Sequence, residues 1–339
     1  MLLGTGTKLM RRREFFTLLG AVATAWPLAA SAQQPDGVRR IGVLMAYSES
    51  DREGQANVAA FRHGLQKLGW TDGRNLRIDS RWAALDAELM QRYAKELIEQ
   101  QPDLILSSST PTTATLLHQT RTIPIIFASL VDPIGSGFVA SLSRPGGNVT
   151  GFTIMESSLS GKWLELLKEI APRVARVAFL FNPATATYAE YYLTPFKAAA
   201  ASFGVEAIAA AVHNTSELES VVAAQARTPN TGLISMPDAF TIDHSKEITL
   251  LAARYRLPAV YPFRFIAEIG GLLSYGNNRS ENYQAVATYA DRILKGAKPR
   301  ELPVQAPVKF ELVINLKTAK ALGLDVPLHL QQIADEVIE

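Results

Sequence analysis

The chain has 339 residues, of which 47% are apolar, and its 34 basic and 32 acidic side chains give a formal net charge of +2. It has no cysteine, which excludes disulfides, a thiol nucleophile, a Cys-ligated metal and a lipid-anchored N-terminal cysteine. The small net charge gives no indication of a nucleic-acid partner. The length and the apolar content are sufficient for a large core and favour two lobes over one.

The first 32 residues are typical of an export signal. Paired arginines within residues 11–13 precede an apolar run over residues 15–26, which is shorter than the roughly 20 residues that a membrane-spanning helix needs. Small residues at 30–32 form a cleavage pattern, so we expect the mature chain to begin at Gln33. The arginine pair resembles a twin-arginine signal, which a receptor reads and which is not an anchor. We therefore expect cleavage near Ala32 and a periplasmic location.

Cleavage of this segment changes the charge. Residues 1–32 contain four basic side chains and one acidic side chain, so the mature chain has 30 basic and 31 acidic side chains and a net charge of about −1. Translation can start at Met1 or at Met10, which directly precedes the arginines. No later segment is long and apolar enough to predict a membrane span.

From residue 38 onward, short β-rich runs alternate with amphipathic helical stretches. Val58, Phe61, Leu65 and Leu68 recur at spacings of three and four residues, which is one face of a helix, whereas alternation over residues 76–82 indicates a strand. The same patterns predict further strands at 38–45, 103–107, 123–130 and 149–154, and helices at 86–100 and 111–119.

The second half repeats this alternation. Leu159, Trp163, Leu166 and Ile170 lie on one side of a predicted helix over residues 159–170. We expect strands at 177–181, 205–212, 233–236, 259–261 and 272–275, with helices at 188–203, 216–227, 244–255 and 281–294. Strands that alternate with helices of this length indicate parallel sheets covered on both faces, and two runs of four or five strands fit two α/β lobes.

The last segments have no sequential place in either half. We expect the helix at 281–294 and the segment 302–323 to cross back between the lobes. The N-terminal lobe then comprises residues 38–152 and about 276–302. The C-terminal lobe comprises residues 153–275 and about 303–339.

Polar and aromatic side chains follow several of the predicted strands. In open parallel sheets, ligands bind outside the carboxyl ends of the strands. The candidates after the strands of the first half are Tyr47, Ser108, Ser109, Thr110, Ser129 and Asp132. Those after the strands of the second half are Asn182, Asp238, Tyr261, Phe263 and Tyr275. Hydroxyls, carboxylates, an amide and aromatic rings suit a small polar organic molecule in a desolvated site.

Some of these residues also have a purely structural interpretation. Thr110 before Pro111 is typical of a helix start, whose free N–H groups can equally bind a carboxylate. Asp132-Pro133 and Asn182-Pro183 are common at the beginning of turns. Tyr261 can pack between the lobes instead of touching a ligand. The shared position of the candidates, more than any one residue, favours a binding site.

Motifs of catalysis are absent from the sequence. It has no Gly-rich phosphate loop that ends in Gly-Lys-Ser/Thr, no His-Glu-x-x-His and no Gly-x-Ser-x-Gly, and its five histidines are scattered. Residues 135–140 match the dinucleotide pattern G-x-G-x-x-A, with Glu156 about twenty residues further on. The helix after this pattern can extend only to about Ser143, because Arg144-Pro145-Gly146-Gly147 ends it. We therefore expect no cofactor and no metal.

Several stretches together form a specific pattern. They are Arg12-Arg13-Glu14-Phe15, Arg40-Ile41-Gly42-Val43-Leu44, and the segments at 64–70, 132–137, 144–151, 162–167 and 310–315. Over nearly its full length the chain resembles the ABC transporter substrate-binding proteins, a family that includes tryptophan-type binding proteins. The resemblance implies a type I periplasmic-binding fold, in which two Rossmann-like lobes joined by several crossovers close on a ligand like a hinge.

The resemblance also implies a membrane permease and an ATPase as partners. It implies ligand contacts on the loops that carry Ser109, Thr110, Asp132, Asn182 and Asp238. The loop of residues 107–111 differs from that of members that bind aromatic amino acids, which leaves the identity of the ligand open.

Together these observations predict a monomeric periplasmic solute-binding protein of a bacterial ABC importer, not an enzyme. We expect an amino-acid-like or aromatic carboxylate that favours the closed form by bridging both lobes. Its carboxylate would bind at residues 109–110 and an amine at Asp238 or Asp132, while Tyr47 or Tyr261 would flank an apolar part. The alternatives are a ligand-sensing periplasmic module and, as a weaker one, a periplasmic α/β enzyme with an acid–base pair.

Overall fold

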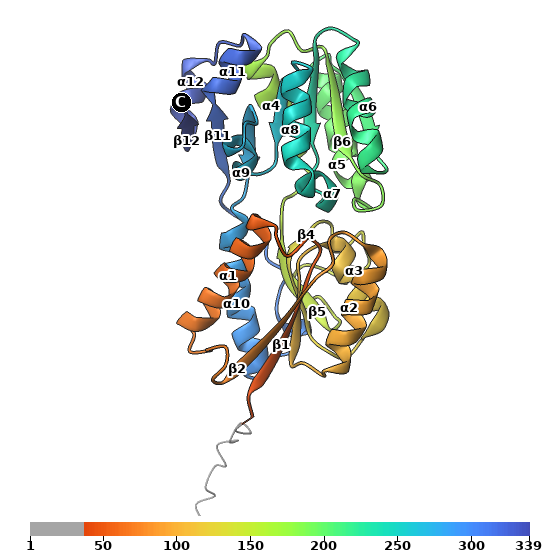
Figure 1. The fold of residues 1–339 in the computed structure, drawn as a ribbon, viewed down its shortest axis with the longest axis vertical. Coiled ribbons are helices and arrows are strands. Elements are labelled where there is room, and N and C mark those ends of the chain that lie inside the picture. Colours follow the sequence, from red (N-terminus) through yellow and green to blue (C-terminus); the bar gives the residue numbers. More distant parts are fainter. Residues whose placement is uncertain (1–36) are drawn as a thin grey trace, which may run out of the picture. The chain divides into compact units, whose positions relative to one another are not determined.

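The computed structural model describes residues 37–339, which form two β-sheets with helices around each (Figure 1). The predicted export signal at 1–32 lies outside the described residues. The first sheet is parallel and has the strand order β2-β1-β3-β4-β5. Its strands are β1 (Arg39–Met45), β2 (Leu76–Trp82), β3 (Leu104–Ser107), β4 (Ile125–Leu130) and β5 (Val149–Thr153). We call this sheet and its helices the first lobe.

The second sheet has the strand order β12-β11-β10-β9-β8-β6-β7. Only β10 and β11 pair antiparallel, and the other neighbours in this sheet are parallel. Its strands are β6 (Arg176–Phe181), β7 (Glu206–Ala211), β8 (Thr231–Ser235), β9 (Ala259–Tyr261), β10 (Leu273–Gly276), β11 (Glu311–Asn315) and β12 (Glu336–Ile338). We call this sheet and its helices the second lobe. Two mostly parallel sheets with flanking helices confirm the predicted α/β class.

Helices cover both faces of the first sheet. The helices α2 (Ala87–Glu99) and α3 (Thr110–Gln119) pack on one face, and α1 (Arg52–Lys67) and α10 (Arg279–Leu294) pack on the other. Successive residues of a strand point to opposite faces. For this reason the buried Leu44 of β1 joins the core under α2 and α3, whereas its neighbour Val43 joins the core under α1 and α10.

The contact between α1 and α10 is close and requires glycine. A Cβ atom added at Gly64 would lie 2.7 Å from Ala287 Cβ and 2.8 Å from the carbonyl oxygen of Gln284. Beyond the end of α1, Trp70 Nε1 donates a hydrogen bond of 2.9 Å to Asp291 Oδ1. These contacts hold α10 to the first lobe, although it follows strands of the second lobe in the sequence.

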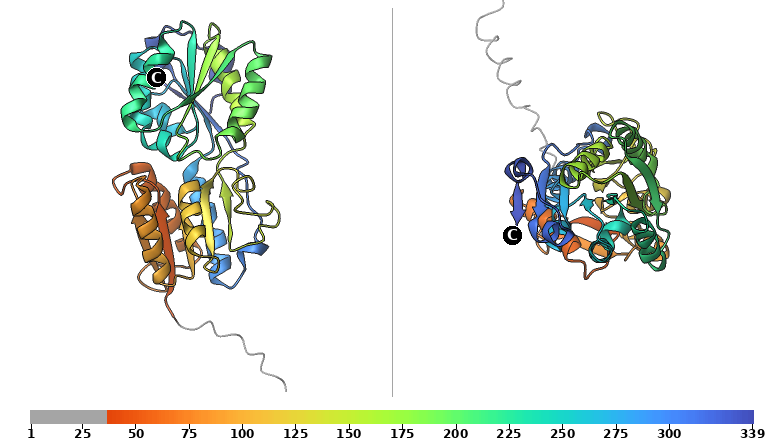
Figure 2. Two further views of the ribbon diagram at one scale, coloured as in Figure 1. Left: turned by 90° about the vertical axis from the view of Figure 1, so that its right-hand side faces the viewer. Right: turned by 90° about the horizontal axis from the view of Figure 1, so that it is seen from above.

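Helices also lie on both faces of the second sheet (Figure 2). The pair α4 (Leu159–Ile170) and α5 (Ala189–Ser202) pack against each other, as do α6 (Thr215–Ala226) and α8 (Ser245–Arg254). Trp163 of α4 is fully buried, with its ring centre 6.1 Å from that of Phe179 and its Nε1 donating to the Tyr275 carbonyl oxygen at 2.7 Å.

The chain passes between the lobes three times. The passages lie between β5 and α4, between β10 and α10, and between the 3-10 helix η1 (Pro299–Glu301) and β11. Along the third passage, the Gln305 N–H donates to the Gly151 carbonyl oxygen at 2.9 Å, and the Thr153 N–H donates to the Gln305 carbonyl oxygen at 2.8 Å. The third passage is therefore hydrogen-bonded to β5.

Seven short elements of the described residues were not predicted. They are η1, β11, β12, α7 (Ala239–Asp243), α9 (Arg264–Glu268), α11 (Leu316–Leu322) and α12 (Leu328–Ile333). None exceeds seven residues, which is too short for a clear hydrophobic period. Residues 133–140 form turns and no helix. Within residues 37–339, no helix has the length and apolar character needed to cross a membrane.

Candidate functional site

Arg279, the first residue of α10, lies close to two aromatic rings. Its guanidinium carbon is 5.2 Å from the ring centre of Tyr47, beyond the end of β1, and 5.3 Å from that of Phe263, beyond the end of β9. Arg279 Nη2 also donates a hydrogen bond of 3.2 Å to the Tyr47 hydroxyl oxygen. One ring comes from each lobe, so the side chain of Arg279 contacts both.

The other donors of Arg279 are unpaired. The residue is only 4% exposed, and its Nε and Nη1 have no hydrogen-bond partner among residues 37–339. No carboxylate of the described chain forms an ion pair with it. A buried charge without a partner is costly. The guanidinium therefore marks a place where a bound group can supply the missing partner.

The same face of α10 carries two further buried polar side chains. Asn282, three residues after Arg279, donates from Nδ2 to the carbonyl oxygens of Thr153 at 3.0 Å and Ala128 at 3.4 Å. Tyr283, four residues after Arg279, is fully buried, and its hydroxyl interacts with the Ser108 side chain. Burial raises the pKa of Tyr283, although Arg279 opposes this shift. The face thus connects Arg279 to the ends of β4 and β5.

The loop after β3 is largely committed to its own structure. Ser108 Oγ accepts a hydrogen bond of 2.9 Å from the Ala46 N–H and so ties β3 to the end of β1. Ser109 caps α3 through a reciprocal capping box with Thr112. Thr110 is 5% exposed, and its hydroxyl makes no hydrogen bond to any described residue. Of these three candidates, only Thr110 keeps an uncommitted hydroxyl.

Ser129 is the penultimate residue of β4, and Asp132 lies in the loop after this strand. Ser129 is 7% exposed, and its Oγ has no partner within residues 37–339. The half-buried Asp132 accepts a hydrogen bond of 2.8 Å from the Gly135 N–H through Oδ1. Its φ of 43° lies in the left-handed region, which aspartate tolerates in turns. Asp132 therefore shapes its turn, whereas Ser129 offers a free hydroxyl.

Asn182 and Asp238 hold the loops of the second lobe together. Asp238 Oδ1 accepts from the Phe240 N–H at 2.8 Å, the Thr241 N–H at 3.1 Å and the Thr185 hydroxyl at 2.8 Å. Asn182 donates from Nδ2 to the His213 carbonyl oxygen at 3.1 Å. Burial raises the pKa of Asp238 to about 6, against the lowering effect of these hydrogen bonds. Much of this carboxylate's bonding capacity is used within the protein.

The aromatic candidates of the second lobe lie in different surroundings. Tyr261 is 1% exposed and belongs to the core, where burial raises its pKa and the Thr249 hydroxyl opposes the shift. Tyr275 is half-buried and stacks on Phe310, with ring centres 5.9 Å apart. Phe263 alone of these three contacts Arg279. The structure thus brings Tyr47 and Phe263 together at Arg279 and leaves Tyr261 and Tyr275 elsewhere.

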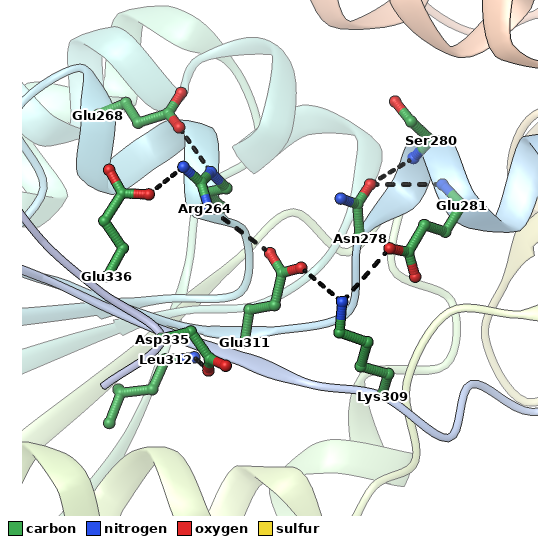
Figure 3. A network of polar contacts seen from close by, with 10 residues as sticks. All are labelled: Arg264, Glu268, Asn278, Ser280, Glu281, Lys309, Glu311, Leu312, Asp335 and Glu336. Atoms are coloured by element: carbon green, nitrogen blue, oxygen red, sulfur yellow. Dashed lines mark hydrogen bonds and ion pairs between the residues drawn. The ribbon is translucent and has the colours of Figure 1, made fainter. Parts of the chain in front are cut away.

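A cavity of about 190 Å³ opens beside Arg279. Its lining includes a second arginine, Arg264, which forms ion pairs with Glu268 at 2.7 Å, with Glu311 at 4.0 Å and with Glu336 (Figure 3). Lys309 extends this network by pairing with Glu311 and Glu281, both at 3.5 Å. The cavity is lined by Glu53, Phe263, Arg264, Phe265, Glu268, Asn277, Asn278, Arg279 and Ser280.

Sequence reasoning did not select Arg279, Asn282, Tyr283 or Asn277. Asn277 is 4% exposed, and neither atom of its amide has a partner in the described residues. Two of the four, Asn277 and Arg279, could have been found, because they closely follow β10 and ligands bind beyond the carboxyl ends of parallel strands. Asn282 and Tyr283 lie inside a helix, so their position relative to the end of a strand gives no information.

Comparisons with known proteins agree on one family. The family model described as "ABC transporter substrate binding protein" matches residues 41–338. A protein named tyrosine-binding protein from Clostridioides difficile (strain R20291) is 25% identical over 265 residues, which are 78% of this chain and 75% of that protein.

Two solved structures are similar over most of the chain. The ABC domain in complex with L-Trp from Streptococcus pneumonia has a TM-score of 0.82 and 27% identity, and the alignment covers 88% of this chain and 99% of that one. A conserved domain protein from Vibrio cholerae has a TM-score of 0.83 and 26% identity, with the same coverage.

The matched family, the Clostridioides protein and the Streptococcus domain are described as binding proteins, which confirms that the chain is a binding protein and not an enzyme. The expected fold of two α/β lobes is also confirmed by the similarity to the L-Trp complex. The match to the family model covers all described secondary structure except the first two residues of β1. The chain therefore belongs to the family of ABC transporter substrate-binding proteins.

Proposed function

We propose that this protein is the exported solute-binding component of an ABC importer, and that it captures a small organic ligand and delivers it to a membrane permease with its ATPase. The observation that carries this proposal is a set of buried polar groups without partners near the carboxyl ends of the strands. Ser129 Oγ and the Nε and Nη1 atoms of Arg279 lack partners in the described residues. Such groups are rare in folded proteins unless something else binds them.

The names of the relatives support a small-molecule ligand. The Streptococcus domain was solved with L-Trp, and the Clostridioides protein is named for tyrosine. Of the predicted contact residues, Tyr47 and Phe263 offer aromatic surfaces, and Thr110 and Ser129 offer hydroxyls that no other residue uses. We expect an amino-acid-like or aromatic carboxylate to contact these four side chains.

Transport requires that the permease distinguish the loaded protein from the empty one. In the proposed mechanism the ligand binds to both lobes and so favours one arrangement of them, which the permease recognises. Arg279 supports this mechanism because its contacts already include one ring from each lobe. The proposal includes a periplasmic location and a monomeric state.

A thermal-shift screen of protein purified after expression of the full chain tests this function. The compounds are amino acids, aromatic acids, sugars, nucleosides and polyamines. A compound that binds the folded state at 100 times its dissociation constant adds about 2.7 kcal/mol of stability. A hit that is recovered unchanged supports a binding protein. A hit that is chemically consumed, or the absence of any hit across all classes, counts against the proposed function.

A further inference from the structure

The charge balance around Arg279 is incomplete. Its guanidinium is buried, two of its nitrogens lack acceptors, and the nearest oxygen partner is a neutral tyrosine hydroxyl. Cation–π contacts with Tyr47 and Phe263 offset part of the cost of burial but supply no hydrogen-bond acceptor. A buried cation with unpaired donors is therefore a candidate to bind a ligand through its charge or its donors.

The second arginine at the cavity provides a comparison. Arg264 is 42% exposed in its side chain and is paired with three carboxylates, so its charge is compensated (Figure 3). Arg279 and Arg264 therefore differ in what they can offer a ligand. Among the residues that line this cavity, Arg279 is the cation without a carboxylate partner.

The geometry of Arg279 restricts how an anion can approach. Aromatic rings lie within 5.3 Å of the guanidinium carbon, one from Tyr47 and one from Phe263. The open donors are Nε and Nη1, and each lies on one of the two edges at which a carboxylate can accept parallel hydrogen bonds from an arginine. A carboxylate that binds here would therefore accept from Nε or Nη1, both of which are buried.

The neighbouring charges favour an anion with a single charge. Glu53 lines the same cavity and attracts Arg279 without a salt bridge, so it opposes any anion there and opposes a dianion more than a monoanion. The start of α3 is a weaker alternative site. The N–H groups of Ser109 and Thr112 are bonded within the capping box and Pro111 has none, so only that of Thr110 is left among residues 109–112.

We propose that Arg279 binds the carboxylate of the ligand, and that the natural ligand is accordingly a monocarboxylate. This inference rests on the proposed function, since it assigns the anion subsite of the same binding site. The carboxylate is thus assigned to the first residue of α10 and not to residues 109–110, where the sequence suggested it. Removal of the ligand's charge and removal of the Arg279 charge then have the same effect on affinity.

The test pairs each ligand with an analogue that lacks the carboxylate charge. Binding of L-tryptophan, L-tyrosine and a panel of other amino and aromatic acids is measured by titration calorimetry and compared with that of their amides. We expect wild-type protein to bind at least one acid and to bind its amide roughly 30-fold or more weakly, the low end of the loss when one partner of a buried charge pair is removed. Arg279→Met should weaken binding of the acid by a similar factor and remove the preference for acid over amide.

Two variants serve as controls. Arg254→Met removes an ion-paired arginine outside this cavity, so acid affinity should change less than about threefold. Arg279→Lys keeps a positive charge without the fork of donors, so it should retain the preference for acids at reduced affinity. It also keeps the test informative if the methionine variant does not fold.

Ligand-free stability separates a binding role from a structural one. Arg279→Met should melt at or above the wild-type temperature, because an unpaired buried charge is removed. The assignment of Arg279 is overturned by a clear fall in the melting temperature of Arg279→Met or by equal affinity of the wild-type protein for acids and amides. It is also overturned if the wild-type protein binds only compounds that lack a carboxylate. Each of these results leaves the proposed function intact. If wild-type protein binds nothing in the charged and neutral panels, both proposals fail together.

Discussion

The Asp238 carboxylate and the Thr185 hydroxyl are joined by a hydrogen bond of 2.8 Å, which holds the start of α7 to the loop after β6. Asp238 Oδ2 also accepts from the Asn182 N–H at 3.3 Å. The sequence suggested Asp238 as a partner for a ligand amine. Its hydrogen bonds to backbone and hydroxyl donors give it a second role, in which it fixes the loops that border the candidate site.

Asp238 should make stability depend on pH. Burial raises its pKa from an ordinary value near 3.8 to about 6, so the folded state binds this proton more tightly than the unfolded state. Its contribution is therefore fully favourable below about pH 4 and is lost as the pH rises to about 6. The loss is on the order of 3 kcal/mol. Urea unfolding between pH 4 and 7.5 checks this by comparing wild type with Asp238→Asn, which lacks the titrating group. A stability difference that stays constant over this range would contradict the prediction.

Gly64 should not tolerate a side chain. A Cβ atom there meets Ala287 Cβ at 2.7 Å and the Gln284 carbonyl oxygen at 2.8 Å, so Gly64→Ala must push α1 away from α10 at a cost of about 1–3 kcal/mol. Gly161, also inside a helix, is the matched control, since its nearest neighbour would be Ala199 Cβ at 3.5 Å. Gly161→Ala should be neutral or add about 0.5–1 kcal/mol through helix propensity. Chemical denaturation of both variants measures the difference, and equal effects would refute the packing argument.

Long periodic elements of this fold could be predicted from the sequence. The bounds of α4 and β2 agree with the predicted 159–170 and 76–82, because a clear helical or alternating period spans each whole element. Short elements such as α7 could not, because five residues contain little more than one helical turn. The start of α1 at Arg52 depends on a cap, in which Asp51 Oδ1 accepts from the Gly54 N–H at 2.6 Å. The apolar spacing that began at residue 58 gave no sign of it.

The candidate site was predictable in location but not in chemistry. Tyr47 and Phe263 could be selected from the sequence because they lie beyond the ends of β1 and β9. Their position did not show that both rings lie close to Arg279. That contact depends on the packing of α10 against α1, and residues 47 and 279 are 232 positions apart in the sequence. Which candidates touch a ligand stays a prediction.

The ion-pair network of Arg264 should add little to stability. Its side chain is 42% exposed, so solvent screens its pairs with Glu268 and Glu336. Arg264→Met should change the free energy of unfolding by about 1 kcal/mol or less, and the change should shrink further in 1 M salt. Denaturation at low and high salt measures both quantities. A loss of several kcal/mol that does not respond to salt would mean that this network supports the packing of β11 and β12.

Ser129 and Ser108 should respond oppositely to the same substitution. Both serines are buried; Ser108 directly follows β3, and Ser129 is the penultimate residue of the neighbouring parallel strand β4. Ser108 Oγ accepts from the Ala46 N–H at 2.9 Å, whereas Ser129 Oγ has no partner in the described structure. Ser108→Ala leaves a buried N–H unsatisfied, which costs about 1–3 kcal/mol. Ser129→Ala removes an unpaired hydroxyl, so the ligand-free protein should be unchanged or slightly more stable.

The two serines should also differ in their effect on ligand binding. If the Ser129 hydroxyl is free because a ligand uses it, Ser129→Ala should lower affinity by about 0.5–1.5 kcal/mol, as for loss of one neutral hydrogen bond. Thermal unfolding without ligand and calorimetry with the best-binding acid measure the two effects separately. Ser129→Ala that loses stability without ligand and keeps full affinity would show that its hydroxyl has a structural partner and no ligand. In that case the free donors of Arg279 would support the site without Ser129.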